Sequence, residues 1–174
     1  MASFIKRGTL LLFVALIGAG ILIFCLIAFI VLSFSLGYAH PTDEEMIANY
    51  AEHKPDFEQL ALTLTTETEI RIIFPKDGKC QFEKRKLNDD ELSEKCNQYI
   101  RAFNLLGLDW TYSGDEPIWL PVSSSGLSVS GSSKGYFFSS IPPKRIVSNT
   151  DNWNGFSIVY RHIEGNWYIF YERS

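Results

Sequence analysis

The chain has 174 residues and a formal net charge of −4 at pH 7, with 16 Lys and Arg residues against 20 Asp and Glu residues. This length allows one ordinary domain plus one additional segment. The acidic balance argues against nucleic-acid binding and against adhesion to anionic lipid head groups.

The additional segment is an uncharged apolar run over residues 9–32, TLLLFVALIGAGILIFCLIAFIVL. About 20 apolar residues are enough for a helix to cross a hydrocarbon core about 30 Å thick. The run exceeds that length. We therefore predict a transmembrane helix over residues 9–36, preceded by a short amino terminus of residues 1–8.

A cleavable signal peptide is the alternative to a membrane anchor. Its apolar region spans only about 7–15 residues, which is shorter than the run found here, although Gly37-Tyr38-Ala39 could serve as a cleavage site. Lipid attachment at Cys25 is disfavoured because Phe24 precedes it where a small residue would be needed. Cys25 is interpreted as a buried apolar residue.

The charges that flank the run predict its orientation. Lys6 and Arg7 lie just before it, and the next positive residue is Lys54. The positive-inside rule then places the amino terminus in the cytoplasm and residues 37–174 outside. All 20 acidic residues lie in this exported part.

Two cysteines, Cys80 and Cys96, lie in the predicted exported part. Two thiols in an oxidising compartment usually pair, so we predict a Cys80–Cys96 disulfide. A structural zinc site would need four nitrogen or sulfur ligands, and the three histidines are scattered along the chain. We predict neither a metal ion nor a cofactor.

The exported part begins with a predicted helix. Thr42 followed by Glu45 forms a capping box, and apolar residues then recur at helical spacing as far as Leu64. Pro55 interrupts this pattern, which predicts a kink or a restart near His53.

A second helix is predicted from Asn88 or Asp89 to Leu106, with Gly107 as its C-terminal glycine. Strand-like segments are predicted at 66–74, 110–112, 118–120, 127–129, 136–138, 156–162 and 167–172. The fold class expected is α+β, with two helices packed on an antiparallel sheet after the transmembrane helix.

The stretch GLSVSGSSKGYFF, residues 126–138, resembles several catalytic loops in composition. A P-loop would require lysine at Ser132, and a nucleophile elbow would require glycine at Ser130. A serine–lysine pair is excluded because Gly131 lies three residues before Lys134. The stretch is interpreted as a small-residue connection between strands, with a ligand-contacting loop as the alternative.

Aromatic residues make up 14% of the chain. Trp153 lies in a polar loop and is the tryptophan expected to be exposed for binding; Lys134 and Tyr136 are the other candidate partner-binding residues. The competing interpretation is that the aromatic residues fill the core. No catalytic residue is predicted.

His162 with Arg161 and Glu164 is the one suggestive acid–base cluster, and it is interpreted as a polar contact at a hairpin end. Gly165 and Asn166 supply the turn of that hairpin.

Four pieces of the sequence carry a family resemblance: TDEEMI-x-N, HK-x-DFEQL, SGLSVSGSSKGY and YRHIEGNWYIFYE. They resemble a family of small exported bacterial proteins that have a short apolar amino-terminal segment and no assigned function. The likeness covers most of residues 41–173. It implies a bacterial, membrane-attached domain and supplies no catalytic residues.

Together these observations predict a single-pass protein of the bacterial inner membrane with a periplasmic α+β domain. Its expected function is that of a non-enzymatic binding or accessory module with a protein partner. The alternatives are a small envelope hydrolase that uses polar residues around Ser128–Lys134 and His162, and an immunity or inhibitor-type protein that binds a basic partner.

Overall fold

The computed structural model describes residues 21–28, 40–66, 70–82, 89–112, 117–127 and 130–174. Residues 1–39 and 40–174 form two compact units. In the first unit, residues 21–28 are helical, and the rest of the predicted membrane helix lies outside the described residues. Within the described part of the chain, no helix has the length and apolar character needed to cross a membrane.

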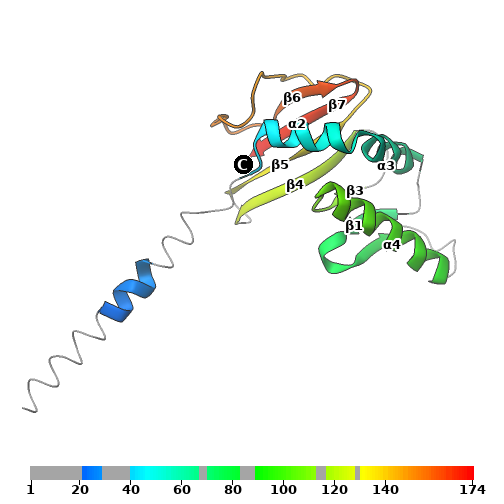
Figure 1. The fold of residues 1–174 in the computed structure, drawn as a ribbon. Coiled ribbons are helices and arrows are strands. Elements are labelled where there is room, and N and C mark those ends of the chain that lie inside the picture. Colours follow the sequence, from blue (N-terminus) through cyan, green and yellow to red (C-terminus); the bar gives the residue numbers. More distant parts are fainter. Residues whose placement is uncertain (1–20, 29–39, 67–69, 83–88, 113–116, 128–129) are drawn as a thin grey trace, which may run out of the picture. The chain divides into compact units, whose positions relative to one another are not determined.

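The second unit is α+β, as predicted (Figure 1). Its elements are α2 (Asp43–Glu52), α3 (Lys54–Thr66), β1 (Ile70–Phe74), a 3-10 helix η1 (Pro75–Asp77), β2 (Lys79–Phe82), α4 (Asp89–Leu106), β3 (Thr111–Tyr112), β4 (Ile118–Leu127), β5 (Ser130–Phe138), β6 (Val159–Glu164) and β7 (Trp167–Arg173). The strands form two antiparallel sheets, in the orders β2-β1-β3 and β4-β5-β7-β6.

The helix ends confirm the sequence predictions. The Thr42 hydroxyl accepts a hydrogen bond from the Glu45 backbone N–H at 3.2 Å, and the Glu45 carboxylate accepts one from the Thr42 N–H at 2.7 Å. Helix α2 ends at Glu52 with His53 as its C-cap, and α3 begins at Lys54, which is the predicted interruption before Pro55. Gly107 adopts a left-handed φ of 67° after α4, where side chains other than glycine are strained.

The hairpin of β6 and β7 turns at Gly165-Asn166, as predicted. The hairpin of β4 and β5 differs from the prediction. Most of the small-residue stretch belongs to the strands themselves and not to a connection between them. Ser123, Ser124 and Ser125 of β4 pair with Lys134, Ser133 and Ser132 of β5. The serine run therefore extends a long hairpin, and residues 128–129 of the predicted strand lie outside the described residues.

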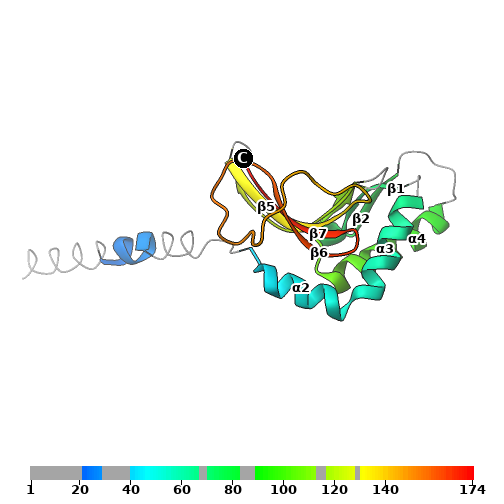
Figure 2. The same ribbon diagram turned by 90° about the horizontal axis from the view of Figure 1, so that it is seen from above.

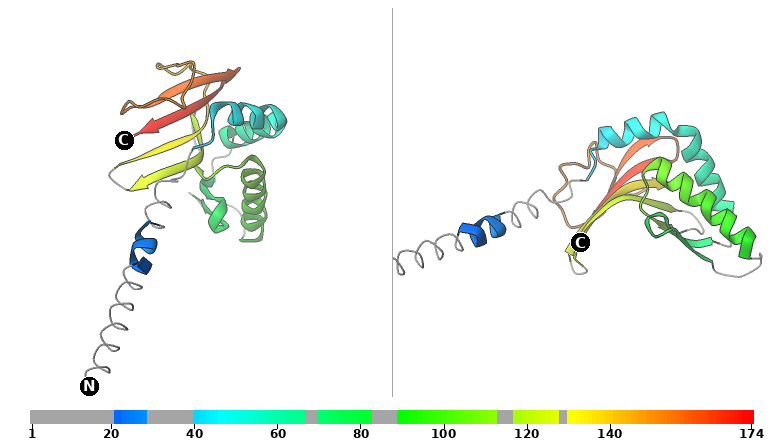
Figure 3. Two further views of the ribbon diagram at one scale, coloured as in Figure 1. Left: turned by 60° about the vertical axis from the view of Figure 1, so that its left-hand side comes forward. Right: turned by 60° about the horizontal axis from the view of Figure 1, so that its bottom comes forward.

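The helices lie along one face of the four-stranded sheet, as two views of the fold show (Figures 2 and 3). The main core forms between them and includes Phe57, Phe103, Tyr136 and Trp167. Because side chains alternate between the two faces of a strand, the neighbouring residues of the same strands point to the opposite face. There a smaller cluster gathers, which contains Phe137, Tyr160, Tyr168 and Phe170.

The predicted disulfide between Cys80 and Cys96 is present. It joins β2 to α4, with 5.8 Å between the two Cα atoms. In the chain-entropy account, a disulfide closing a loop of this size contributes about 3 kcal/mol to stability. The bond therefore holds the three-stranded sheet against α4.

Close packing explains why residue 135 of the small-residue stretch is a glycine. A Cβ atom built on it would lie 2.3 Å from the Leu120 carbonyl oxygen and 2.8 Å from the Phe170 ring. Only glycine lets β5 pass this closely between its neighbours, so this glycine is a packing requirement of the sheet.

Candidate functional site

The sheet face away from the helices carries an aromatic cluster. Trp119 of β4 packs edge-on against Phe137 and Phe170, with ring centroids 4.7 and 4.9 Å apart. Phe137 also packs against Tyr160, at 4.8 Å. Such pairs add to stability beyond the apolar area they bury. They also hold the rings in a fixed arrangement on neighbouring strands.

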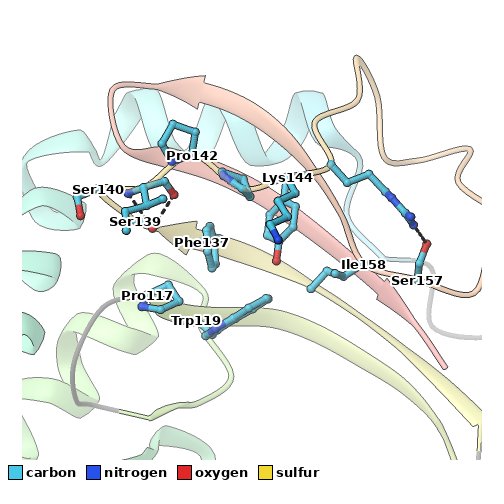
Figure 4. Close-up of a pocket in the computed structure, with 13 residues that line it drawn as sticks. Pro117, Trp119, Phe137, Ser139, Ser140, Pro142, Lys144, Ser157 and Ile158 are labelled. Carbon is cyan, nitrogen blue, oxygen red and sulfur yellow. Dashed lines mark hydrogen bonds between the residues drawn. The ribbon is translucent and has the colours of Figure 1, made fainter.

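A cavity of about 670 Å³ lies between this face and the segment that joins β5 to β6 (Figure 4). Trp119, Phe137 and Tyr160 supply its aromatic wall. The full lining consists of Pro117, Trp119, Phe137, Ser139, Ser140, Ile141, Pro142, Pro143, Lys144, Arg145, Ser157, Ile158 and Tyr160. This volume falls in the range of about 300–1,000 Å³ that is typical of small-molecule sites.

The rim of this cavity is held at both ends. The Ser139 hydroxyl donates to the Ile141 carbonyl at 2.8 Å and accepts from the Ile141 N–H at 3.2 Å. At the other end, the Tyr160 N–H donates to the Arg145 carbonyl at 2.9 Å, and the Tyr160 carbonyl accepts from Val147 at 2.7 Å. Between these points, two consecutive prolines fix their own φ angles, so the rim is shaped before any ligand arrives.

Two cations border the aromatic wall. Lys144 and Arg145 both line the cavity, and both are exposed. The Arg145 guanidinium donates to the Ser157 hydroxyl at 2.5 Å, which leaves most of its five N–H donors for another group. Among the described residues, no carboxylate forms an ion pair with either cation.

A second cavity, of about 460 Å³, adjoins the first on the same face. The two share Trp119, Ile158 and Tyr160 in their linings. The second cavity also includes Glu172, so its charge differs from that of the first. The aromatic face therefore offers one extended surface that is basic at one end and acidic at the other.

The opposite face of the sheet holds a buried ion cluster around Lys134. This lysine is 1% exposed, and its ammonium lies 2.8 Å from the Asp43 carboxylate and in contact with Asp151. The Thr150 backbone N–H and hydroxyl both donate to Asp43, at 2.7 and 2.5 Å. Arg161 adds a contact to Asp43 at 3.3 Å.

This cluster pins the middle of the β5–β6 segment to the start of α2, because Thr150 and Asp151 belong to that segment and Asp43 to the helix. Burial opposes the ionisation of Asp43, but the hydrogen bonds from Lys134 and Thr150 outweigh it and lower its pKa. The carboxylate is therefore charged at neutral pH, and the cluster has a structural explanation without any ligand.

A second polar group forms where residue 40 meets the serines of the β4–β5 hairpin. His40 Nδ1 lies 2.6 Å from Ser123 Oγ, and His40 Nε2 lies 2.7 Å from Ser132 Oγ. Ser132 Oγ is also 2.9 Å from Ser125 Oγ. Burial, and then the charge of Lys134, lowers the pKa of His40. A neutral imidazole next to a hydroxyl is the arrangement of a nucleophile and its general base.

The structure corrects two of the three predicted partner-binding residues. Lys134 and Tyr136 are each 1% exposed, so neither side chain offers a surface to a partner. Tyr136 Oη donates to the Met46 carbonyl at 2.8 Å, and burial raises its pKa to about 12. Both residues point to the helix-covered face, because they alternate with Phe137 along β5.

Trp153 is only partly exposed. Its ring packs closely against Gly155, because a Cβ atom added to Gly155 would lie 2.8 Å from the Trp153 ring. The tryptophan therefore packs on its own loop, and Trp119 is the one that lines both cavities.

The residues around His162 do not converge. Arg161 reaches Asp43 and Glu44 on α2, whereas Glu164 pairs with Lys54 at 2.6 Å. His162 points to the other face, where it contacts the Gly165 carbonyl at 3.0 Å. The interpretation as a polar contact at the hairpin end is confirmed for His162.

Comparison of the chain with protein-family models, with curated proteins and with solved structures finds no match. The candidate site therefore rests on its own geometry.

Sequence reasoning missed the aromatic face, although the alternation of Trp119 with Ile118 and Leu120 could have revealed it.

Proposed function

We propose that this protein is a binding or accessory domain, without catalytic activity, that holds its ligand on the aromatic face of the four-stranded sheet. The observation that carries the proposal is the pair of adjoining cavities that share Trp119, Ile158 and Tyr160. The rim of the first cavity is fixed by hydrogen bonds and prolines, so binding there requires little ordering of the chain.

In this proposal, residues 9–36 anchor the protein in the bacterial inner membrane, with residues 37–174 in the periplasm. The uncharged run, the preceding Lys6 and Arg7, and the resemblance to exported proteins support this placement. The Cys80–Cys96 disulfide is compatible with an exported domain, since such bonds persist in oxidising compartments.

A second candidate function is a small envelope hydrolase, favoured by the 2.7 Å contact between His40 Nε2 and Ser132 Oγ. In that role Ser132 would be the nucleophile and His40 its base. The partner of the other imidazole nitrogen is the Ser123 hydroxyl rather than a carboxylate, which would stabilise a protonated His40 less well. The binding function therefore remains our first proposal.

Site-specific photocrosslinking in intact cells tests the binding function. We expect p-benzoylphenylalanine at Ile141, which lines the first cavity and is 76% exposed, to form a discrete adduct that raises the mass of the purified chain. The same group at Phe74, 39% exposed on β1 of the other sheet, is the matched control. Equal adduct yields at both positions, or none at Ile141, would contradict the proposal.

A further inference from the structure

The first cavity combines an aromatic wall with two adjacent cations, and this combination indicates the kind of ligand. We propose that it takes a small amphipathic carboxylate, whose apolar body packs on Trp119 and Phe137 and whose carboxylate pairs with Lys144 and Arg145. The inference rests on the proposed binding function and adds the ligand class to it.

The charges of the cavity favour an anionic ligand. The chain is acidic as a whole, yet the cavity rim carries two consecutive cations and no lining carboxylate. Arg145 is oriented by its hydrogen bond to Ser157, and its planar guanidinium can bind a carboxylate through two parallel hydrogen bonds. Lys144 adds a second positive charge to the lining of the same cavity.

The apolar lining selects a singly charged anion of moderate size. Removing a charge from water is costly, and the cost rises with the charge, so a carboxylate enters an aromatic cavity more readily than a dianionic phosphate. The volume of about 670 Å³ suits a small molecule. Glu172 in the adjoining cavity repels an anion there, which places the carboxylate at the Lys144–Arg145 end.

Calorimetric titration of the full chain with 4-phenylbutyrate and with its uncharged amide, 4-phenylbutyramide, tests this inference. We expect the acid to bind at least about tenfold more tightly than the amide, because it gains charge-assisted hydrogen bonds. The double variant Lys144→Ala/Arg145→Ala should abolish this preference, so that acid and amide bind with similar affinity. Lys79→Ala, which removes an exposed cation on β2, should change neither affinity.

Other outcomes would overturn the inference. Equal binding of acid and amide, with both lost in Trp119→Ala, would overturn the carboxylate assignment and leave the aromatic face as the binding surface. Absence of binding by either probe would also overturn it, without touching the crosslinking result at Ile141. Tighter binding of acetyl-Ala-Ala-Phe than of 4-phenylbutyrate would replace the small molecule with a peptide carboxyl terminus.

Discussion

Replacing Lys134 with methionine is expected to lower the free energy of unfolding by about 3–5 kcal/mol, since it leaves a buried carboxylate without its main counter-charge. Asp43 is fully buried, and its carboxylate lies 2.8 Å from the Lys134 ammonium. The loss also releases Asp151, which fixes the middle of the β5–β6 segment. Urea denaturation followed by tryptophan fluorescence measures the change.

A surface ion pair supplies the control for this substitution. Lys54 lies 2.6 Å from Glu164, but the two side chains are 42% and 60% exposed. Lys54→Met should therefore cost less than about 1 kcal/mol. Similar losses for the two variants would show that the Lys134 cluster does not hold the fold together.

Replacing Phe57 with alanine is expected to cost about 3–5 kcal/mol, because it opens a cavity in the main core. Its ring is fully buried and lies 4.6 Å from Tyr136 and 5.4 Å from both Tyr50 and Trp167, measured between ring centroids. The side chain thus joins α2, α3, β5 and β7. Chemical denaturation at 25 °C gives the change in unfolding free energy.

Leu62→Ala on the same helix is the matched control, because Leu62 is 60% exposed. Its cost should stay within about 0.5 kcal/mol, as for most surface substitutions. If Phe57→Ala lowers the free energy of unfolding no more than Leu62→Ala does, the Phe57 ring is not packed between the helices and the sheet.

The local elements were predictable from the sequence because their signals are short-range. The Thr42–Glu45 capping box, Gly107 after α4 and the Gly165-Asn166 turn depend on residues within a few positions of one another. The Cys80–Cys96 bond was predictable for a different reason: these are the only two cysteines in the predicted exported part.

The candidate sites were not predictable, because they depend on contacts between distant residues. His40 meets Ser132 across 92 positions, and Asp43 meets Thr150 across 107. Lys134 was expected at a partner surface because it stands in a polar, glycine-rich stretch. Its buried charge is compensated by Asp43 and Asp151, which lie elsewhere in the chain. No local sequence pattern shows that these two residues converge on Lys134.

Binding on the aromatic face and catalysis by the serine–histidine group lead to different expected results, and one measurement compares the two functions directly. The adduct yield of the Ile141 photocrosslinker in intact cells is measured in Trp119→Ala and in Ser132→Ala backgrounds, with equal amounts of folded chain. We predict that Trp119→Ala removes the adduct and that Ser132→Ala leaves its yield unchanged. An adduct that survives Trp119→Ala but disappears with Ser132→Ala would contradict the account and favour the hydrolase.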